Sequence, residues 1–205
     1  MSRVTTVTKT RKEFRDEFTG QTIPVGSTVY KWTTGWGGRE KVSTRRPKES
    51  EMTNSEGLAT VLAALEAVEE GTPGDEFGPD EMDDFASLLD EQADEARSGG
   101  ELLGEAADNI ESGFPNGNYL ADEMRARADA AETMADEMTN AAEAVRSAAS
   151  EWEAFLTTHA DVLGDAKTPD DLPEDFDTDL AAELTELYEA AVTAIEDASN
   201  ITYDG

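Results

Sequence analysis

Few side chains in this sequence have the types and spacing that catalysis requires. The chain contains one histidine, His159, and no cysteine. His159 falls near the expected end of a helix, where the helix dipole favours an imidazolium, so we assign it a structural role. The sequence contains no Ser/His/Asp set, phosphate-binding glycine loop or nucleotide fingerprint. We therefore expect a protein that is not an enzyme and that has no cofactor.

Carboxylates are abundant and occur in clusters. Hard cations such as Ca²⁺ prefer oxygen ligands, but a calcium loop also requires a fixed ligand spacing and a turn glycine. Residues 170–179 lack that pattern. We expect a solvated acidic surface and no metal site at the three clusters, which are Asp80-Glu81 with Asp83-Asp84, Asp170-Asp171, and Glu174-Asp175 with Asp177.

One group of residues has the composition of an interaction surface. Cations and aromatic side chains alternate over residues 28–48, as they do in nucleic-acid-binding surfaces. The alternative is a small sheet whose aromatic side chains form its own core and whose cations are solvated or contact the acidic helices. High salt favours this alternative, because phosphate contacts weaken steeply as salt rises. The candidate interaction patch consists of Tyr30, Trp32, Trp36, Arg39, Lys41, Arg45 and Arg46.

The net charge of the 205-residue chain is −31. Self-repulsion of this size opposes a compact fold in dilute buffer, whereas molar salt shortens the Debye length to about 3 Å and screens it. Intrinsic disorder is the competing interpretation of so much charge. We favour a halophilic, acidic protein adapted to a saline cytoplasm, because the apolar residues are strictly periodic.

The charge is also distributed unevenly. Residues 1–50 hold eleven Lys/Arg and five Asp/Glu, a net charge of +6. Residues 51–205 hold five Lys/Arg and 42 Asp/Glu, a net charge of −37. Such asymmetry indicates two modules with different partners.

The basic N-terminal module is predicted to contain a β-hairpin. β-Branched and aromatic residues alternate over residues 28–33, which predicts a strand. The glycine-rich segment 35–38 predicts the loop, and residues 39–44 the return strand, which ends before Pro47. Since no cysteine is available for zinc, we expect aromatic packing around Trp32 to hold the hairpin together.

Helices are predicted for the rest of the chain, over about 55–70, 80–112, 119–159 and 179–199. Both long helices carry rows of apolar residues spaced by seven, one large and one small, which predict a coiled-coil seam. Their short connection makes them antiparallel. The rows are Met82/Leu89/Ala96/Leu103/Ile110 and Ala86/Ala93/Gly100/Ala107, followed by Met124/Ala131/Met138/Val145/Trp152 and Ala128/Ala135/Ala142/Ala149/Leu156.

Two local features qualify the hairpin prediction. Gly99 lies outside both rows, so we expect a local bend there. The end of the third helix, with Trp152 and Phe155, extends beyond the second and is expected to hold the first and last helices. The predicted fold is mainly α: an antiparallel, Ala-rich helical hairpin with accessory helices and a small N-terminal β-hairpin module.

The expected organisation has four parts. A basic β-ribbon module over residues 1–50 precedes a helical domain over residues 51–163 that contains the hairpin. An acidic linker follows over residues 164–178, and a C-terminal helix covers residues 179–205. No run of 18 apolar residues predicts a membrane span, and the N-terminal segment lacks the apolar core of a secretion signal.

Several stretches of the first 53 residues resemble the zinc-ribbon module of uncharacterised tailed-phage proteins. In those proteins two Cys-x-x-Cys knuckles flank a hairpin, and a helical segment follows. The later stretch Asp108–Phe114 is similar to the tip of their helical hairpin. The stretches that carry the likeness are Phe14–Gly26, Val29–Trp32, Gly38-Arg39, Arg46-Pro47 and Ser50–Thr53.

This chain departs from that family at the metal site. The knuckle positions fall near Asp16 and Thr19 and near Ser43 and Arg46, and none of these is a cysteine. We therefore read the module as zinc-ribbon-like without its zinc. The resemblance implies a viral protein of a haloarchaeal virus or provirus, located in the host cytoplasm or associated with the virion and not secreted by a signal peptide.

Two functions follow as hypotheses. The first is a non-enzymatic scaffold or adaptor that works through protein-protein interaction, with oligomerisation available through the helical arm. The alternative is a nucleic-acid-binding accessory protein that uses the basic aromatic ribbon. Aromatic side chains of the ribbon that face solvent together with the cations favour nucleic acid, whereas aromatic side chains buried against the helices favour the scaffold. We expect no membrane partner.

Overall fold

The computed structural model describes residues 4–34, 38–114, 118–173 and 176–205. The chain divides into two compact units. The first comprises Met1–Ala63 and Ser98–Ala128, and the second comprises Ala64–Arg97 and Asp129–Gly205. The long helices therefore contribute residues to both units.

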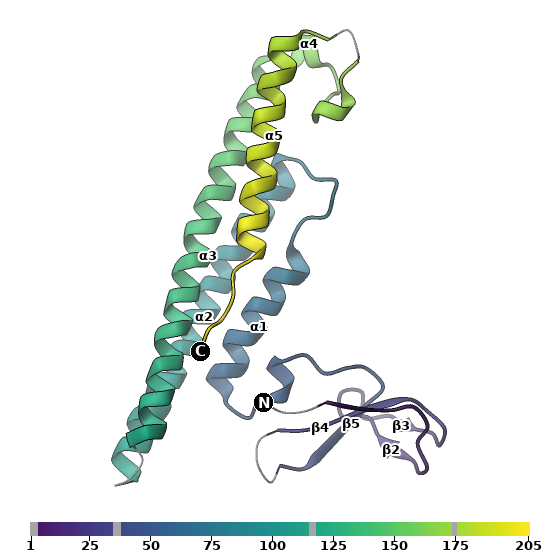
Figure 1. Cartoon of the computed structure of the whole chain (residues 1–205), viewed down its shortest axis with the longest axis vertical. Coiled ribbons are helices and arrows are strands. Elements are labelled where there is room, and N and C mark those ends of the chain that lie inside the picture. Colours follow the sequence, from purple (N-terminus) through teal and green to yellow (C-terminus); the bar gives the residue numbers. More distant parts are fainter. Residues whose placement is uncertain (1–3, 35–37, 115–117, 174–175) are drawn as a thin grey trace. The chain divides into compact units, whose positions relative to one another are not determined.

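The described part of the N-terminal segment forms two antiparallel sheets (Figure 1). The larger sheet has the strand order β1-β4-β5, and β2 pairs with β3 in the smaller one. The predicted hairpin is confirmed, because β4 pairs with β5 from Tyr30↔Ser43 to Thr33↔Glu40. Most of the predicted glycine loop lies outside the described residues. The strands are β1 (Thr5–Val7), β2 (Phe14–Arg15), β3 (Thr22–Ile23), β4 (Val29–Thr33) and β5 (Glu40–Ser43).

The two faces of strand β4 are buried in different surroundings. Successive side chains of a strand point to opposite faces, so Val29 and Trp32 lie on different sides of the sheet. Val29 forms a small apolar core with Ile23 and Val42, against which Val7 and Phe14 pack. The face of Trp32 carries the polar contacts of the candidate site.

The helical elements agree closely with the predicted segments. Pro79 begins α2, where its missing N–H breaks no helical bond. Asp177 caps α5 by accepting hydrogen bonds from the N–H groups of Asp179 (3.0 Å) and Leu180 (3.2 Å). No helix in the described ranges is long and apolar enough to cross a membrane. The elements are η1 (Ser50–Met52), α1 (Glu56–Gly71), α2 (Pro79–Gly113), α3 (Asn118–Thr158), α4 (Ala160–Leu163), η2 (Pro169–Asp171) and α5 (Thr178–Ser199).

The antiparallel, Ala-rich hairpin of α2 and α3 is confirmed (Figure 1). Along α3, Ala135, Ala142 and Ala149 are at most 1% exposed, and the small row of α2 is buried throughout. Ion pairs between the two helices show that they run antiparallel. As the residue number of the α2 partner increases, the residue number of the α3 partner decreases. These pairs are Asp90–Arg146 (2.6 Å), Arg97–Asp136 (3.2 Å) and Asp108–Arg125 (3.1 Å).

Gly99 has a packing role in the first unit that the sequence analysis did not foresee. A Cβ atom on Gly99 would lie 2.7 Å from Cγ2 of Val61 and 2.8 Å from the carbonyl oxygen of Gly57. A Cβ atom on Gly57 would in turn lie 2.6 Å from the carbonyl oxygen of Gly99. Glycine at both positions therefore lets the backbones of α1 and α2 approach closely.

An aromatic cluster joins three segments of the second unit. Trp152 of α3 makes edge-to-face contacts with Phe77, at a centroid distance of 5.9 Å, and with Tyr188 of α5, at 5.5 Å. Its indole Nε1 donates a hydrogen bond to the carbonyl of Lys167 at 3.1 Å. The last helix therefore packs on the distal part of α3, where the sequence predicted it. The first helix was expected at the same place, but its close contacts at Gly57 and Gly71 are with α2.

Candidate functional site

Two turns of the N-terminal module meet at one buried carboxylate. In the first turn, the N–H of Gly20 donates to the carbonyl of Asp16 at 3.0 Å, and Gly20 has a φ of +67°, which favours glycine. Oδ1 of Asp16 accepts hydrogen bonds from the N–H groups of Phe18 (3.0 Å) and Thr19 (3.1 Å). An aspartate that binds the backbone two and three residues ahead is typical of such turns.

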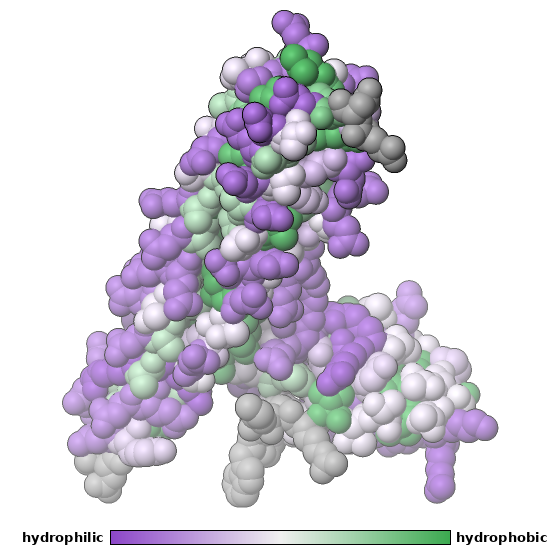
Figure 2. All heavy atoms as spheres, turned by 45° about the horizontal axis from the view of Figure 1, so that its top comes forward, coloured by the Kyte–Doolittle hydropathy of each residue, from purple (hydrophilic) through white to green (hydrophobic). Residues whose placement is uncertain are grey.

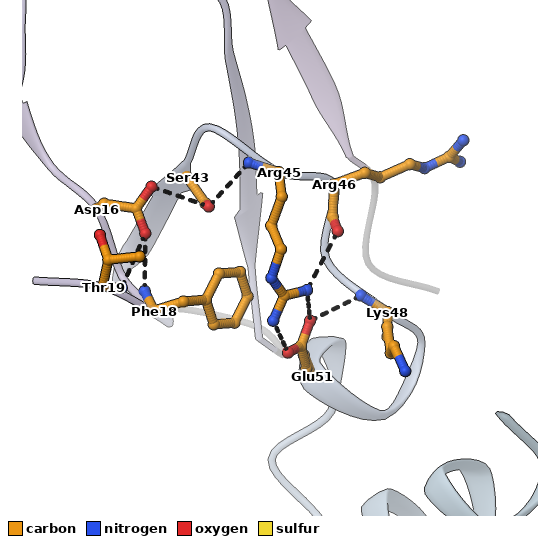
Figure 3. Close-up of polar contacts among 8 residues, drawn as sticks. All are labelled: Asp16, Phe18, Thr19, Ser43, Arg45, Arg46, Lys48 and Glu51. Carbon is orange, nitrogen blue, oxygen red and sulfur yellow. Dashed lines mark hydrogen bonds and ion pairs between the residues drawn. The ribbon is translucent and has the colours of Figure 1, made fainter. Parts of the chain in front are cut away.

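The second turn follows strand β5 and is bonded to the same carboxylate (Figure 3). Oδ2 of Asp16 accepts from the hydroxyl of Ser43 (3.1 Å) and from the N–H (2.9 Å) and hydroxyl (3.1 Å) of Thr44. The Ser43 hydroxyl itself accepts from the N–H of Arg45 at 3.1 Å. Asp16 thus links the segment after β2 to the end of β5.

The carboxylate of Asp16 is held in its ionised form. Asp16 is only 3% exposed, and burial by itself raises the pKa of a carboxyl group. Hydrogen bonds from Thr44, Thr19, Phe18 and Ser43 outweigh burial and lower the pKa of Asp16 far below its ordinary value. Five donated hydrogen bonds therefore replace the water that the carboxylate has lost.

A cation and two aromatic rings stack beside this junction. The guanidinium of Arg45 lies 3.7 Å from the ring centroid of Phe18. Phe18 stacks on Trp32 at a centroid distance of 5.6 Å and an interplanar angle of 17°. Arg45 also forms a two-bond ion pair with Glu51, and although burial raises the pKa of Glu51, the hydrogen bond from Arg45 lowers it overall. The stack of Arg45, Phe18 and Trp32 therefore covers the face of the sheet on which Trp32 lies.

The predicted interaction patch does not form one solvent-facing surface. Trp32 is 2% exposed and Tyr30 is half-buried, while Trp36 lies outside the described residues. Arg39 and Lys41 both contact Glu17, at 3.4 and 3.8 Å. The side chain of Arg46 points away from the junction (Figure 3). Aromatic packing in the ribbon is therefore present around Trp32, but its partner is Phe18, which the sequence analysis did not name.

Trp32 has one unusual feature. Its indole Nε1 is buried and has no hydrogen-bond partner among the residues that the structure describes. A buried donor without a partner costs about 1–3 kcal/mol, so the stack on Phe18 and the surrounding packing must outweigh this cost.

Several described cations for which no acidic partner is found lie outside the predicted patch, on the segment that follows β1. Lys9 and Arg11 are exposed. The Lys12 ammonium lies 5.2 Å from the ring centroid of Phe14, and Nε of Arg15 donates to the carbonyl of Gly20 at 3.1 Å. The sequence analysis missed this group. The available signal was the absence of any Asp or Glu from residues 1–12.

The tip of the helical hairpin exposes large apolar side chains. Phe114 is 65% exposed, Tyr119 is 82% exposed and Leu120 is 46% exposed. On the face shown in Figure 2, hydrophilic side chains cover most of the helical surface. Three exposed apolar side chains so close in sequence make the tip a second candidate contact site.

Each acidic cluster contributes one described residue that caps a helix or turn, and for the third cluster this is Asp177 at the start of α5. Glu81 accepts from the N–H of Gly78 at 3.0 Å, just before α2. Asp171 accepts from the N–H groups of Lys167 (3.2 Å) and Thr168 (2.9 Å), and the bonds from Thr168 lower the pKa of Asp171. Glu174 and Asp175 lie outside the described residues. Within the described ranges, no group of three or more His, Asp or Glu side chains is arranged to hold a metal ion.

Two surface hollows and the single histidine also lie among the described residues. A hollow of about 260 Å³ is lined by Arg15, Asp16, Glu17, Gly20 and Arg39. A second, of about 360 Å³, is lined by residues of the α1–α2 connection and by Glu81, Asp84, Phe85 and Leu88 of α2. His159 packs on the ring of Phe155 at a centroid distance of 4.6 Å. Neither hollow contains a nucleophile paired with a base.

No protein-family model matches this chain, and comparisons with curated proteins and with solved structures find no match either.

Proposed function

We propose that this chain is a non-enzymatic scaffold or adaptor protein of a haloarchaeal virus or provirus. In this proposal the helical hairpin presents a protein-binding surface at its tip, and the N-terminal module provides a second point of attachment. The observation that carries the proposal is the exposure of Phe114, Tyr119 and Leu120. Exposed apolar side chains on an otherwise polar surface are typical of protein-protein contact sites.

The packing of the hairpin supports this role, since an adaptor must hold its contact surface in a defined position. Met82, Leu89 and Leu103 of α2 are fully buried, as are Met138 and Val145 of α3. Near the tip, Arg125 of α3 bonds both Asp108 and Glu111 of α2. These contacts clamp the two helices together where the exposed side chains begin.

The halophilic setting is supported by the net charge of −31, because molar salt screens the repulsion that this charge creates. The viral setting is supported by the resemblance described above. The turns assigned there to the two knuckles meet at the carboxylate of Asp16, which bonds both Thr19 and Ser43. This junction is compatible with a zinc-ribbon-like module that is held by hydrogen bonds instead of a metal.

The alternative, a nucleic-acid-binding accessory protein, has less support. Of the cations in the predicted patch, Arg39 and Lys41 contact Glu17, and Arg45 is paired with Glu51. Phosphate binding would have to compete with these carboxylates. Trp32 is buried, so it offers no open face on which a base could stack.

Affinity capture from a haloarchaeal lysate at about 2 M KCl tests the proposal. At this salt concentration the repulsion among the carboxylates is screened, so the chain should be folded. The variant Phe114→Ser/Tyr119→Ser/Leu120→Ser should lose the proteins that the wild-type chain captures. Val162→Ser, which removes another exposed apolar side chain (57% exposed), should retain them. Circular dichroism should show equal helicity in all three proteins.

Two outcomes would contradict the adaptor proposal. If the triple variant captured the same proteins equally well, the tip would not be the protein-binding surface. Nucleic acid that copurifies with the chain, together with loss of the captured proteins after nuclease treatment, would favour the alternative.

A further inference from the structure

Strand β1 lies at one edge of the three-stranded sheet. It pairs with β4 from Thr5↔Lys31 to Val7↔Val29. Within the described part of the chain, Thr5, Thr6 and Val7 have no other backbone hydrogen-bond partner. The outer side of β1 therefore presents free N–H and C=O groups, which are a template for a further strand.

This edge has one of the devices that commonly limit strand addition, since β1 is only three residues long. It lacks the others, which are lysine, proline, a bulge or an inward-pointing charge within the strand. From Val4 to Thr8 the chain contains only valine and threonine, which favour extended backbone. The side chains of Thr5 and Thr6 are exposed.

The charge next to this edge is positive. Lys9 and Arg11 follow β1 directly and are exposed, and the first acidic residue of the chain is Glu13. On the opposite edge of the sheet, Lys41 of β5 already contacts Glu17. On the central strand, Lys31 is paired with Glu40 at 2.8 Å. Lys9 and Arg11, which follow β1 in the chain, have no carboxylate partner among the described residues.

We propose that the β1 edge binds an extended acidic peptide segment of a partner protein by strand addition. The backbone groups of Thr5–Val7 supply the hydrogen bonds, and alternate carboxylates of the peptide face Lys9 and Arg11. A strand added at this edge extends the sheet from three strands to four. This surface is separate from the hairpin tip, so each proposal can fail without the other.

A fluorescein-labelled octapeptide of alternating valine and aspartate is the probe. Its fluorescence anisotropy is measured with the full chain, at the lowest KCl concentration that gives full helicity. Lys9→Glu/Arg11→Glu should weaken binding by about tenfold, the size expected for exposed charge pairs. Arg46→Glu, which reverses an exposed cation that follows β5 at the opposite edge of the sheet, should leave the affinity unchanged.

A second probe separates backbone bonding from charge attraction. The same peptide with N-methyl groups on alternate residues keeps its charge but cannot donate those hydrogen bonds, and it should bind at least about tenfold more weakly. The unmodified peptide should slow amide hydrogen exchange in residues 4–8. Equal binding of the methylated peptide would overturn the proposal. So would tighter binding of oligothymidylate at the same residues, or sedimentation showing that β1 pairs with a second copy of the chain.

Discussion

The N-terminal module and the helical hairpin carry opposite charge, yet both place their scarcer charge where two elements join. In the module, which is poor in acids, Asp16 bonds the turn after β2 to the end of β5. In the hairpin, which is poor in cations, Arg97, Arg125 and Arg146 each reach from one helix to the other. Where most side chains repel one another, the minority charge has many partners, so it can join neighbouring elements.

The two regions differ in how deeply these charges are buried. Asp16 is 3% exposed and receives five hydrogen bonds, whereas the side chains of Arg97, Arg125 and Arg146 are 39–41% exposed. Exposed ion pairs contribute little because water and salt screen them. Removing one partner from a buried charged network costs much more. The joint of the module should therefore be far more sensitive to mutation than the joints of the hairpin.

Salt should have the largest effect, and it should act mainly on the helices. In about 10 mM KCl the repulsion among the 42 carboxylates of residues 51–205 is unscreened, so far-UV circular dichroism should show reduced helicity that recovers at about 2 M. The module, with a net charge of +6, should change much less. Full helicity at low salt, with no rise in Tm at high salt, would refute the halophile interpretation.

Asp16→Asn should destabilise the module by about 3 kcal/mol, because the amide presents N–H groups to donors that need an acceptor. Hydrogen exchange should rise in residues 14–44 while the helices keep their protection. Glu17→Gln is the matched control. Glu17 contacts Arg39 at 3.4 Å and Lys41 at 3.8 Å. Because such long ion pairs at the surface contribute little, Glu17→Gln should lower the free energy of unfolding by less than about 1 kcal/mol. An equal loss of stability in both variants would show that burial of the carboxylate does not determine how much each residue stabilises the module.

Acid should move the two regions in opposite directions. Because the pKa of Asp16 is lower in the folded chain, its contribution to stability is complete above the unfolded value of about 3.9 and is lost as pH falls below it. In dilute salt, protonation of the surface carboxylates relieves repulsion, so helicity should rise between about pH 5 and pH 3. Segment-resolved hydrogen exchange from about pH 5 down to about pH 2 measures both changes. Parallel loss of protection in the two regions would contradict the comparison.

Gly99→Ala tests a joint of the helices that depends on shape instead of charge. The new methyl group would meet Val61 and the backbone of Gly57 at 2.7–2.8 Å, so the variant should lose about 2 kcal/mol of stability. At Gly104, another glycine of α2, a Cβ atom would meet nothing within 4 Å. Gly104→Ala should therefore stabilise the chain by about 0.5–1 kcal/mol through helix propensity. Chemical denaturation in molar KCl measures both, and a stabilised Gly99→Ala variant would be inconsistent with the close crossing.

Arg97→Gln should have the smallest effect, about 0.5 kcal/mol, since the ion pair with Asp136 is exposed. A double-mutant cycle with Asp136→Asn isolates the pair, and the coupling energy should shrink as KCl increases. A coupling energy above about 2 kcal/mol would show that the exposed arginine pairs stabilise the hairpin about as strongly as Asp16 stabilises the module.

The hairpin could be predicted because its information is repetitive. Apolar residues recur every seven positions in each row, so Ala135 and Ala142 of the small row and Met138 of the large row all indicate the same buried helix face. The Asp16 junction is specified only once. Its bond to Ser43 joins residues 27 positions apart, and an aspartate in a turn gives no sign of its distant partner. The packing role of Gly99 was missed for the same reason, because its partner Gly57 belongs to another helix. Exposure at the hairpin tip depends on packing, which no local pattern encodes.

The series of cross-helix arginine pairs also restricts how the length of this chain can change during evolution. An insertion in α2 alone would move its residues out of register with their partners on α3, including Asp90 with Arg146. A matched insertion or deletion of seven residues in both helices keeps every row and every pair, and changes the hairpin length by about 10 Å. Natural relatives of this chain should therefore differ by paired heptads in α2 and α3, so that the reach of the tip varies in discrete steps.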